Sequence, residues 1–308
     1  MTRMTSAELR GLHQISAGNG LMLVIACDQR GSMRTLMSSD PAVQATISME
    51  RLGETKADVT THLASSATAI LLDPIAAVPG IVDLGILPRD IGLIIGLDDS
   101  GYGSTPEGYR LSKLVPGISA RRVRDLGGTA GKIMVYLRSD FPAANAHNID
   151  ILKACIADFA AENLLLVVEF LTYALPGETE ADYKAKTGAL IEGGSRLCLD
   201  LGAKLLKIPF PGSAESARRI TEMCGPVPWA VLSAGGDHAT FVGQVEICMA
   251  AGAAGVIAGR SLWKDCVTLD RDETRRRLSE RAIPRLNDLK RILDRYARPL
   301  ACNREAAS

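Results

Sequence analysis

Eight short apolar runs, each rich in branched side chains, recur along the 308-residue chain and limit the folds that it can adopt. Hydrophobic residues follow one another within each run instead of alternating with polar ones. Such continuous runs indicate strands buried on both faces, as in parallel sheets covered by helices. The runs span Leu21–Asp28, Thr68–Pro74, Gly92–Asp98, Gly131–Leu137, Leu164–Leu171, Leu205–Phe210, Trp229–Ala234 and Gly255–Arg260.

Stretches of helical period lie between most of these runs. One spans Asn148–Ala161, with Leu152, Ile156 and Phe159 on one face, and another spans Ser216–Cys224. Eight strand-then-helix units over roughly 250 residues predict a closed (β/α)8 TIM barrel of the α/β class. We expect a single domain over residues 1–300, followed by a disordered tail at 301–308. A doubly wound open sheet is the alternative fold.

Two crossovers depart from this pattern. The segment Ile75–Ile91 contains Pro79, Gly80 and Pro88, so it leaves room only for a very short helix. Residues 99–117 begin with a loop rich in glycine, which we interpret as a rim or lid segment of the barrel. Its Gly-x-Gly is not a dinucleotide fingerprint, because the third glycine and the helix that should follow are missing.

Charge and composition exclude several classes of function. Lys plus Arg and Asp plus Glu number 35 each, so no net field favours nucleic acid or an anionic membrane. The seven cysteines have no CxxC spacing, which is typical of reduced, buried side chains in a cytoplasmic protein. The first apolar run, at Leu21, begins too late and is too short for a signal peptide or a membrane span.

A basic stretch near the carboxyl terminus has a structural explanation. Apolar residues fall at helical spacing between Leu278 and Tyr296, with arginines and lysines around them. Aspartates and glutamates are interleaved with these cations. The pattern therefore predicts a solvated helix face over an apolar stripe, not a nucleic-acid-binding helix.

Lys207 stands inside the apolar run Leu205–Phe210. Burial disfavours the ammonium form of a lysine, so a lysine enclosed by apolar side chains becomes a usable nucleophile for a carbonyl carbon. Lys207 is therefore a candidate Schiff-base lysine. Of the ten lysines we expect only Lys132 and Lys207 to be embedded in the fold, and we expect Lys204 to face solvent.

The polar residue that ends each strand matters most, because a barrel of this kind has its active site at the carboxyl ends of the strands. Two lysines, several carboxylates, a hydroxyl and an arginine at one mouth indicate carbonyl chemistry on an anionic substrate. These residues are Asp28, Asp73, Asp98, Lys132, Glu169, Lys207, Ser233 and Arg260.

Individual strand-end residues suggest different roles. We interpret Asp73 and Asp98 as caps of turns. Lys132 would bind phosphate, pair with a carboxylate, or favour the neutral amine of Lys207 through like-charge proximity. A buried carboxylate needs a partner or a proton, and either suits Glu169 as a general acid or base.

Small residues follow the seventh and eighth runs, in Ser233–Gly236 and Ala258–Arg260. They let backbone amides approach an anion, and the loops in these two places are the usual phosphate site of the fold. We expect no metal site. No pair of histidines can face a common zinc ion. No sequence motif supports a magnesium site built from Asp73 and Asp98. We interpret Cys27 as core packing rather than as a nucleophile.

Six segments, in order over nearly the whole chain, resemble the class I tagatose-1,6-bisphosphate aldolases. Relatives within that family cleave 6-deoxy-6-sulfofructose 1-phosphate. The Asp-Gln-Arg motif at the first strand and the lysine of the sixth strand are the specific features. The six segments are Ala26–Gly31, Leu71–Pro74, Glu169–Tyr173, Leu206–Pro209, Leu232–Gly235 and Ala258–Trp263.

The resemblance implies a retro-aldol cleavage that needs neither a metal nor a cofactor. Lys207 would form an imine with the ketone of the substrate, with Lys132 beside it. Glu169 would shuttle protons at the carbinolamine and at the C4 hydroxyl. Asp28 and Gln29 would orient the hydroxyls of the substrate.

The resemblance also concerns the substrate, a ketose phosphate whose anionic end group Ser233, Gly235 and Arg260 would hold. Tagatose or fructose 1,6-bisphosphate is the expected substrate, cleaved to dihydroxyacetone phosphate and a three-carbon aldehyde. The alternative is 6-deoxy-6-sulfofructose 1-phosphate, which would give sulfolactaldehyde. We also expect a homo-oligomer, either a dimer or a tetramer. The rim cations that would serve the C6 end are Arg30, Arg110, Lys113 and Arg138.

Two functions of other classes stay open at this point. A pyridoxal-phosphate enzyme would also use a buried lysine and a phosphate-binding mouth. A non-catalytic barrel that binds sugar phosphates is the second alternative. The embedded pair of Lys132 and Glu169 speaks against it, because burying both charges is costly without a task.

Overall fold

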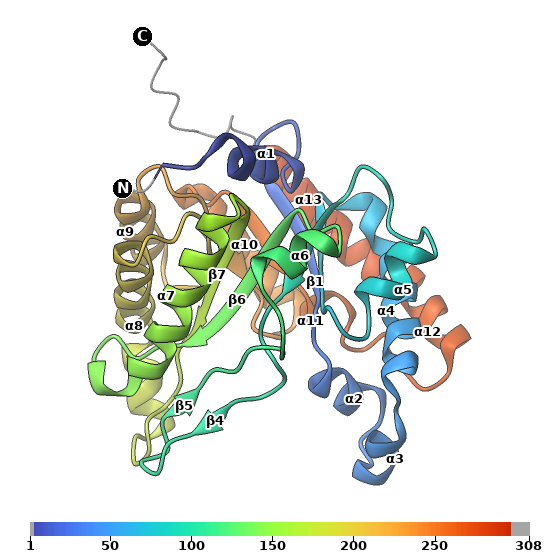
Figure 1. The fold of residues 1–308 in the computed structure, drawn as a ribbon, viewed down its shortest axis with the longest axis horizontal. Coiled ribbons are helices and arrows are strands. Elements are labelled where there is room, and N and C mark those ends of the chain that lie inside the picture. Colours follow the sequence, from blue (N-terminus) through green and yellow to red (C-terminus); the bar gives the residue numbers. More distant parts are fainter. Residues whose placement is uncertain (1–2, 297–308) are drawn as a thin grey trace.

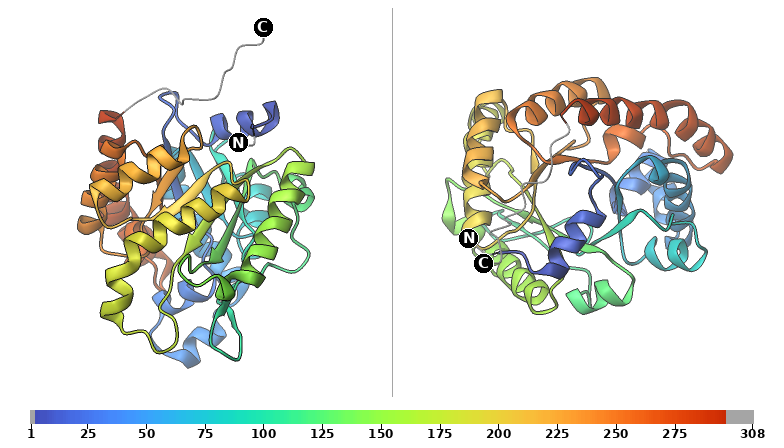
Figure 2. Two further views of the ribbon diagram at one scale, coloured as in Figure 1. Left: turned by 90° about the vertical axis from the view of Figure 1, so that its left-hand side faces the viewer. Right: turned by 90° about the horizontal axis from the view of Figure 1, so that it is seen from above.

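The eight apolar runs form eight parallel strands of a closed barrel, which a ring of helices surrounds (Figure 2). The computed structural model describes residues 3–296, so the tail expected at 301–308 lies outside the described residues. Around the barrel the strands follow the order β1 (Met22–Cys27), β2 (Ala69–Leu72), β3 (Gly92–Gly96), β6 (Ala130–Tyr136), β7 (Leu165–Leu171), β8 (Leu206–Pro209), β9 (Trp229–Leu232) and β10 (Gly255–Ala258).

The first strand closes the barrel. It pairs in parallel with β2, where Val24 lies opposite Ala69, and with β10, where Met22 lies opposite Gly255. Because the strands from both ends of the chain meet, the sheet has no edge. The predicted (β/α)8 barrel is confirmed, and the alternative of an open sheet is wrong.

Helices cover the outer face of the barrel (Figures 1 and 2). Polar caps begin several of them; for example, Ser48, Thr179 and Asp237 each accept a hydrogen bond from a backbone amide in the first turn. The helices are α1 (Ser6–Gln14), α2 (Gly31–Met37), α3 (Pro41–Thr46), α4 (Met49–Leu63), α5 (Val78–Asp83), α6 (Ala120–Asp125), α7 (Ala146–Ala161), α8 (Glu180–Asp200), α9 (Ala214–Cys224), α10 (His238–Ala251), α11 (Arg260–Trp263), α12 (Arg271–Arg277) and α13 (Ile283–Arg295). Short 3-10 turns span Ala64–Ser66 and Pro142–Asn145, and a π-helical turn spans Leu278–Ala282.

Two apolar layers hold this architecture together. Side chains such as Ile25 and Val168 pack between the strands and the helices. Val24 and Ala26, which alternate with Ile25, lie instead in the second layer, inside the barrel. Because side chains alternate along a strand, every second residue points into the barrel, which is filled by packed side chains.

Helix α1 covers the amino-terminal end of the barrel, with Leu12 and Ile15 packed on the interior layer (Figure 1). Glu8 of this helix accepts hydrogen bonds from Lys204 Nζ at 2.6 Å to both carboxylate oxygens. The side chain of Lys204 is only 13% exposed. The expectation that Lys204 faces solvent is therefore wrong, because α1 covers the place where β8 begins.

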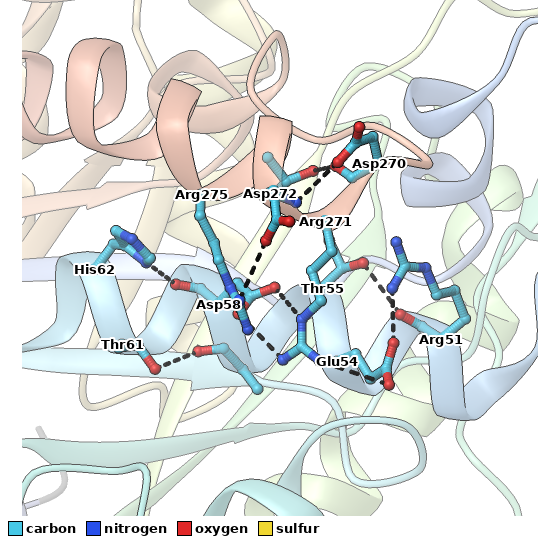
Figure 3. A network of polar contacts seen from close by, with 12 residues as sticks. Arg51, Glu54, Thr55, Asp58, Thr61, His62, Asp270, Arg271, Asp272 and Arg275 are labelled. Carbon is cyan, nitrogen blue, oxygen red and sulfur yellow. Dashed lines mark hydrogen bonds and ion pairs between the residues drawn. The ribbon is translucent and has the colours of Figure 1, made fainter.

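Ion pairs join the helix region after β1 to the helix region after β10 (Figure 3). Asp58 of α4, which is almost fully buried, accepts from Arg271 Nε at 2.7 Å and from Arg275 Nε at 2.9 Å. Arg276, farther out on α12, pairs with Glu273. The predicted stripe lies on α13, where Leu286, Leu289 and Leu293 are buried. The exposed Arg291 and Arg295 pair with Asp288 and Glu246, which confirms the prediction of a solvated helix face.

Lys56 of α4 is fully buried, so the expectation that only Lys132 and Lys207 are embedded is wrong. Its ammonium group pairs with Asp73, just beyond β2. The other carboxylate oxygen of Asp73 accepts hydrogen bonds from two backbone amides of the turn that follows. The prediction of Asp73 as a turn cap is confirmed.

The two unusual crossovers differ in outcome. The second contains only α5, six residues long, as its prolines predict. The third contains an antiparallel hairpin of β4 (Gly103–Ser104) and β5 (Arg110–Leu111), which the sequence did not reveal. In Figure 1 this hairpin lies at the end of the barrel opposite α1, which is the carboxyl-terminal end of the strands. Within residues 3–296 no helix is both long and apolar enough to cross a membrane.

Candidate active site

Four predicted site residues extend the packed interior of the barrel by one layer. Each stands two residues after an apolar residue of the interior, so the alternation of side chains aims it into the same space at the carboxyl-terminal end. The pairs are Ala26 and Asp28, Ala130 and Lys132, Val167 and Glu169, and Leu205 and Lys207.

One carboxylate oxygen lies between the two lysines. Glu169 on β7 is the register partner of Lys207 on β8, and its Oε2 accepts a hydrogen bond from Lys207 Nζ at 2.8 Å. The same oxygen lies 3.3 Å from Lys132 Nζ. All three side chains are buried, with residue exposures of 2% to 7%. Glu169 is therefore placed to exchange a proton with the amine of Lys207.

Three carboxylates surround Lys132. Besides Glu169, its Nζ lies 2.7 Å from Asp28 Oδ2 and 2.6 Å from Asp98 Oδ1. Burial on its own lowers the pKa of Lys132, but the negative charges of the three carboxylates outweigh it and hold the pKa well above its usual value. Lys132 is therefore a permanent ammonium group, and of its three predicted roles the structure shows the pairing with carboxylates.

The two aspartates at this ammonium group differ in protonation. Burial raises the pKa of Asp28, yet Lys132 and Lys207 together overcome it and hold the pKa well below its usual value. For Asp98, burial dominates and the charges of Asp28 and Glu169 add to it, so its pKa is raised despite Lys132. Asp28 is thus the firm anion of the pair, and Asp98 takes up a proton more easily.

Asp98 corrects the sequence analysis. We expected it to cap a turn, but its carboxylate faces Lys132 inside the barrel mouth. The available signal was the period of two: Asp98 stands two residues after Gly96 and four after Ile94, which lies in the barrel interior.

Gln29 lies beside this cluster. Its Nε2 donates a hydrogen bond to Asp28 Oδ1 at 2.8 Å. Its Oε1 is buried, and within residues 3–296 it has no hydrogen-bond partner. A buried amide oxygen without a partner is costly, so this atom is an acceptor available to a hydroxyl of a ligand.

The loops after β9 and β10 lie against each other. Gly235 has a φ of 78°, in the left-handed region that favours glycine, and a Cβ there would lie 3.2 Å from Arg260 Cζ. Lys264, which the sequence analysis missed, donates from Nζ to the carbonyl oxygen of Gly235 at 2.8 Å. Ser233 is buried at the end of β9. The three predicted anion-binding residues thus come from two adjoining loops.

Two of the four expected rim cations are not available to a ligand. Arg138 is fully buried and pairs with both Asp140 and Glu178. Arg30 is 4% exposed, and its Nη2 pairs with Asp99 at 2.8 Å. Their assignment to the C6 end of a substrate is wrong, because their side chains fold inward onto carboxylates.

Cys27 lies beside the site residue Asp28. Cys27 is fully buried, and burial raises the pKa of its thiol to about 12, which confirms that it is a core residue. Among residues 3–296 no group of three or more His, Cys, Asp or Glu side chains could hold a metal ion.

Comparison with known proteins places this barrel in a family. The model of the DeoC/LacD family of aldolases matches residues 22–265, which include all eight barrel strands. The chain belongs to the DeoC/LacD aldolase family. Aldolases are carbon–carbon lyases, so the cluster around Lys207 and Glu169 is the candidate active site of such an enzyme.

Relatives of this chain match over almost their full length. Tagatose 1,6-diphosphate aldolase of Listeria monocytogenes is 27% identical, with 97% of this chain and 95% of the relative covered. Tagatose 1,6-diphosphate aldolase 2 of Streptococcus mutans is 25% identical, with 94% of each chain covered. The crystal structure of an archaeal fructose 1,6-bisphosphate aldolase superposes with a TM-score of 0.62 at 20% identity, covering 92% of this chain and 97% of that chain, and shows the common fold.

Replacing Lys132 tests the charge balance of the site. We expect Lys132→Met to lower the free energy of unfolding by roughly 3–5 kcal/mol near neutral pH, because it leaves buried carboxylates without their cation. In the wild type the depressed pKa of Asp28 stabilises the fold above its unfolded-state pKa of roughly 3.9, and this contribution is lost in acid. In the variant the pKa values of Asp28 and Asp98 rise, so acid stabilises it relative to the wild type.

The measurement is urea unfolding of both proteins between about pH 7 and pH 4, over which the difference in stability should shrink. Lys153→Met on the exposed face of α7 is the matched control, with an expected change within about 0.5 kcal/mol. A difference that does not depend on pH would contradict this description of the site.

Proposed function

We propose that this protein is a Schiff-base aldolase that cleaves a ketose phosphate and that Lys207 forms the imine. The observation that supports this most is the position of Glu169 Oε2, which lies 2.8 Å from the amine of Lys207 and 3.3 Å from the ammonium group of Lys132. A nucleophilic amine paired with a buried carboxylate provides both the attacking group and the proton carrier that imine chemistry needs.

Imine formation begins when Lys207 loses a proton to Glu169. The free amine attacks C2 of the ketose, and the proton that the attacking nitrogen loses goes to the carbonyl oxygen to give a neutral carbinolamine. Glu169 then supplies a proton to the departing hydroxyl, which leaves as water, and a protonated imine remains. The hydrogen bond at 2.8 Å gives Glu169 the reach for each of these transfers at the nitrogen and the adjacent oxygen.

Cleavage of the C3–C4 bond follows. A base removes the proton of the C4 hydroxyl, the aldehyde departs, and the electron pair of the broken bond moves into the imine to give an enamine. Glu169 is the proposed base, because its carboxylate is held beside the imine nitrogen. Protonation of the enamine at C3 and hydrolysis of the imine release dihydroxyacetone phosphate, and they consume the water released earlier.

Lys132 and Asp28 have supporting roles in this proposal. Lys132 compensates the negative charge of the three carboxylates, so that they can lie buried beside Lys207. The firm anion Asp28 and the open Oε1 of Gln29 are acceptors for substrate hydroxyls. The adjoining loops with Ser233, Gly235 and Arg260 would hold the phosphate, in the place that is usual for this fold.

Tagatose or fructose 1,6-bisphosphate is the proposed substrate. The two relatives described above are both tagatose 1,6-diphosphate aldolases, which supports the first of these. The aldehyde product is then glyceraldehyde 3-phosphate. A homo-oligomer, either a dimer or a tetramer, and a cytoplasmic location stay predictions, as does the assignment of residues 1–300 to a single aldolase domain.

An assay against ketose phosphates tests the proposed function. We expect purified protein to release dihydroxyacetone phosphate from tagatose or fructose 1,6-bisphosphate equally well with and without EDTA, because the imine itself accepts the electron pair. Lys207→Met should lower turnover by roughly 10³-fold or more. Loss of activity in EDTA, restored by a divalent ion, would instead assign a metal-dependent mechanism. A preference of tenfold, about 1.4 kcal/mol, for 6-deoxy-6-sulfofructose 1-phosphate would change the substrate and leave the mechanism intact.

Glu169→Gln tests the proton transfers assigned to Glu169. We expect the variant to form a trappable imine more slowly, because Glu169 also carries protons in that step, and to lose roughly 10²-fold or more in kcat, the scale of removing a positioned general acid or base. Single-turnover kinetics with borohydride trapping measure the two steps separately. Turnover close to that of the wild type would move the proton transfer to another carboxylate, with Asp28 next in position.

A further inference from the structure

The β4–β5 hairpin is fixed onto the barrel by buried polar side chains. Asn148 of α7, which is fully buried, donates from Nδ2 to the carbonyl oxygens of Arg110 at 2.8 Å and of Tyr136 at 2.7 Å. Its Oδ1 accepts from the backbone amide of Ser112 at 2.8 Å, and Ser112 Oγ accepts from the amide of Tyr136 at 3.1 Å. The backbone of Arg110 is therefore held in one position relative to β6.

Three tyrosine rings surround the side chain of Arg110. Its Cζ lies 4.4 Å from the ring centroid of Tyr102, 5.1 Å from that of Tyr136 and 5.0 Å from that of Tyr173. The ring centroid of Tyr136 lies 5.3 Å from that of Tyr102 and 5.9 Å from that of Tyr173, and both pairs of rings meet edge to face. We call these four residues the Arg110 cage. Stacking on aromatic rings orients a guanidinium group and leaves its N–H donors free at the ring edges.

The charge of Arg110 lacks an anionic partner in the part of the chain that the structure describes. Its side chain makes no ion pair and no hydrogen bond within residues 3–296, although its backbone makes several. Arg138, two residues after the end of β6, differs from Arg110 because its guanidinium group pairs with two carboxylates. Burial raises the pKa of Tyr136 above its usual value although Arg110 opposes this, so its phenol is neutral near pH 7. The cage thus holds a positive charge that nothing in it neutralises.

The cage stands above the catalytic cluster. Tyr136 is four residues beyond Lys132 on β6, and Tyr173 is four residues beyond Glu169, past the end of β7. Four residues of strand span roughly 13 Å, and Tyr136, the last residue of β6, points to the same side of the sheet as Lys132. Arg110 packs on these rings and therefore lies farther out along the barrel axis than Lys132 and Glu169, on the side where substrate enters. The cage is built from other segments of the chain than the loops after β9 and β10.

We propose that Arg110 binds the anionic group at the C6 end of the ketose phosphate and thereby determines specificity for substrates charged at C6. This inference rests on the proposed function. The loops after β9 and β10 would hold the phosphate at C1, and the cage faces the mouth from β5, β6 and the segment after β7. Phosphate and sulfonate share the oxyanion chemistry that a guanidinium group recognises, so both are candidates for the C6 group.

The test compares substrates that differ only at C6. Kinetics of Arg110→Gln are measured with fructose 1,6-bisphosphate, with 6-deoxy-6-sulfofructose 1-phosphate and with fructose 1-phosphate, whose C6 is uncharged. We expect kcat/KM for the two substrates charged at C6 to fall roughly 10- to 100-fold, the usual effect of losing a charge-assisted hydrogen bond. The value for fructose 1-phosphate should change less than about threefold.

Two further variants serve as controls. Lys153→Gln removes an exposed cation from α7, to which no role in binding is assigned, and should leave all three substrates within about threefold. Arg110→Lys keeps the charge but loses the planar donors, so its loss should be intermediate and again confined to the substrates charged at C6.

Equal losses on fructose 1-phosphate and on the substrates charged at C6, or equal losses from the control Lys153→Gln, would overturn the role of Arg110 while the proposed function stands. A wild type that cleaves none of the three ketoses would instead overturn the proposed function. The wild-type preference between the bisphosphate and the sulfonate identifies which oxyanion the cage receives.

Discussion

The Lys132 ammonium group, buried among Asp28, Asp98 and Glu169, is the interaction on which the rest of the site depends. Leaving buried carboxylates without a cation costs several kcal/mol, so the cluster is stable only with Lys132 in place. With the charge of these carboxylates compensated, one oxygen of Glu169 serves both lysines. In the proposed mechanism, this shared oxygen is the group that takes the proton from Lys207.

Strand period positions this cluster. Residues of the barrel interior are apolar near the amino-terminal end, where α1 covers them, and become charged two residues farther along four different strands. The change from Val167 to Glu169 on β7 and from Leu205 to Lys207 at β8 places a carboxylate and an amine side by side through strand register alone. Farther along the same strands, aromatic side chains such as Tyr136 form the outer layer around Arg110. The mouth is thus built in layers: apolar, charged, aromatic.

Sequence reasoning predicted what depends on local pattern and missed what depends on contacts between distant segments. Continuous apolar runs predicted the strands, and a lysine inside such a run stood out at Lys207. Lys56 did not, because it lies in a polar helix and its partner Asp73 is on another element. The sequence predicts a free rim cation at Arg138, because nothing in it indicates that Asp140 and Glu178 fold onto this side chain. The hairpin that carries Arg110 is likewise held by Asn148 of α7, a contact across 38 residues of chain.

Identifying the lysine that carries substrate carbon tests the central claim most directly. Incubation with dihydroxyacetone phosphate, reduction with borohydride and peptide mass spectrometry locate the trapped adduct. The geometry around Glu169 predicts that the adduct is on the peptide containing Lys207 and that it is absent from Lys207→Met. An adduct on Lys132 or Lys204, or no adduct in an active enzyme, would contradict the account.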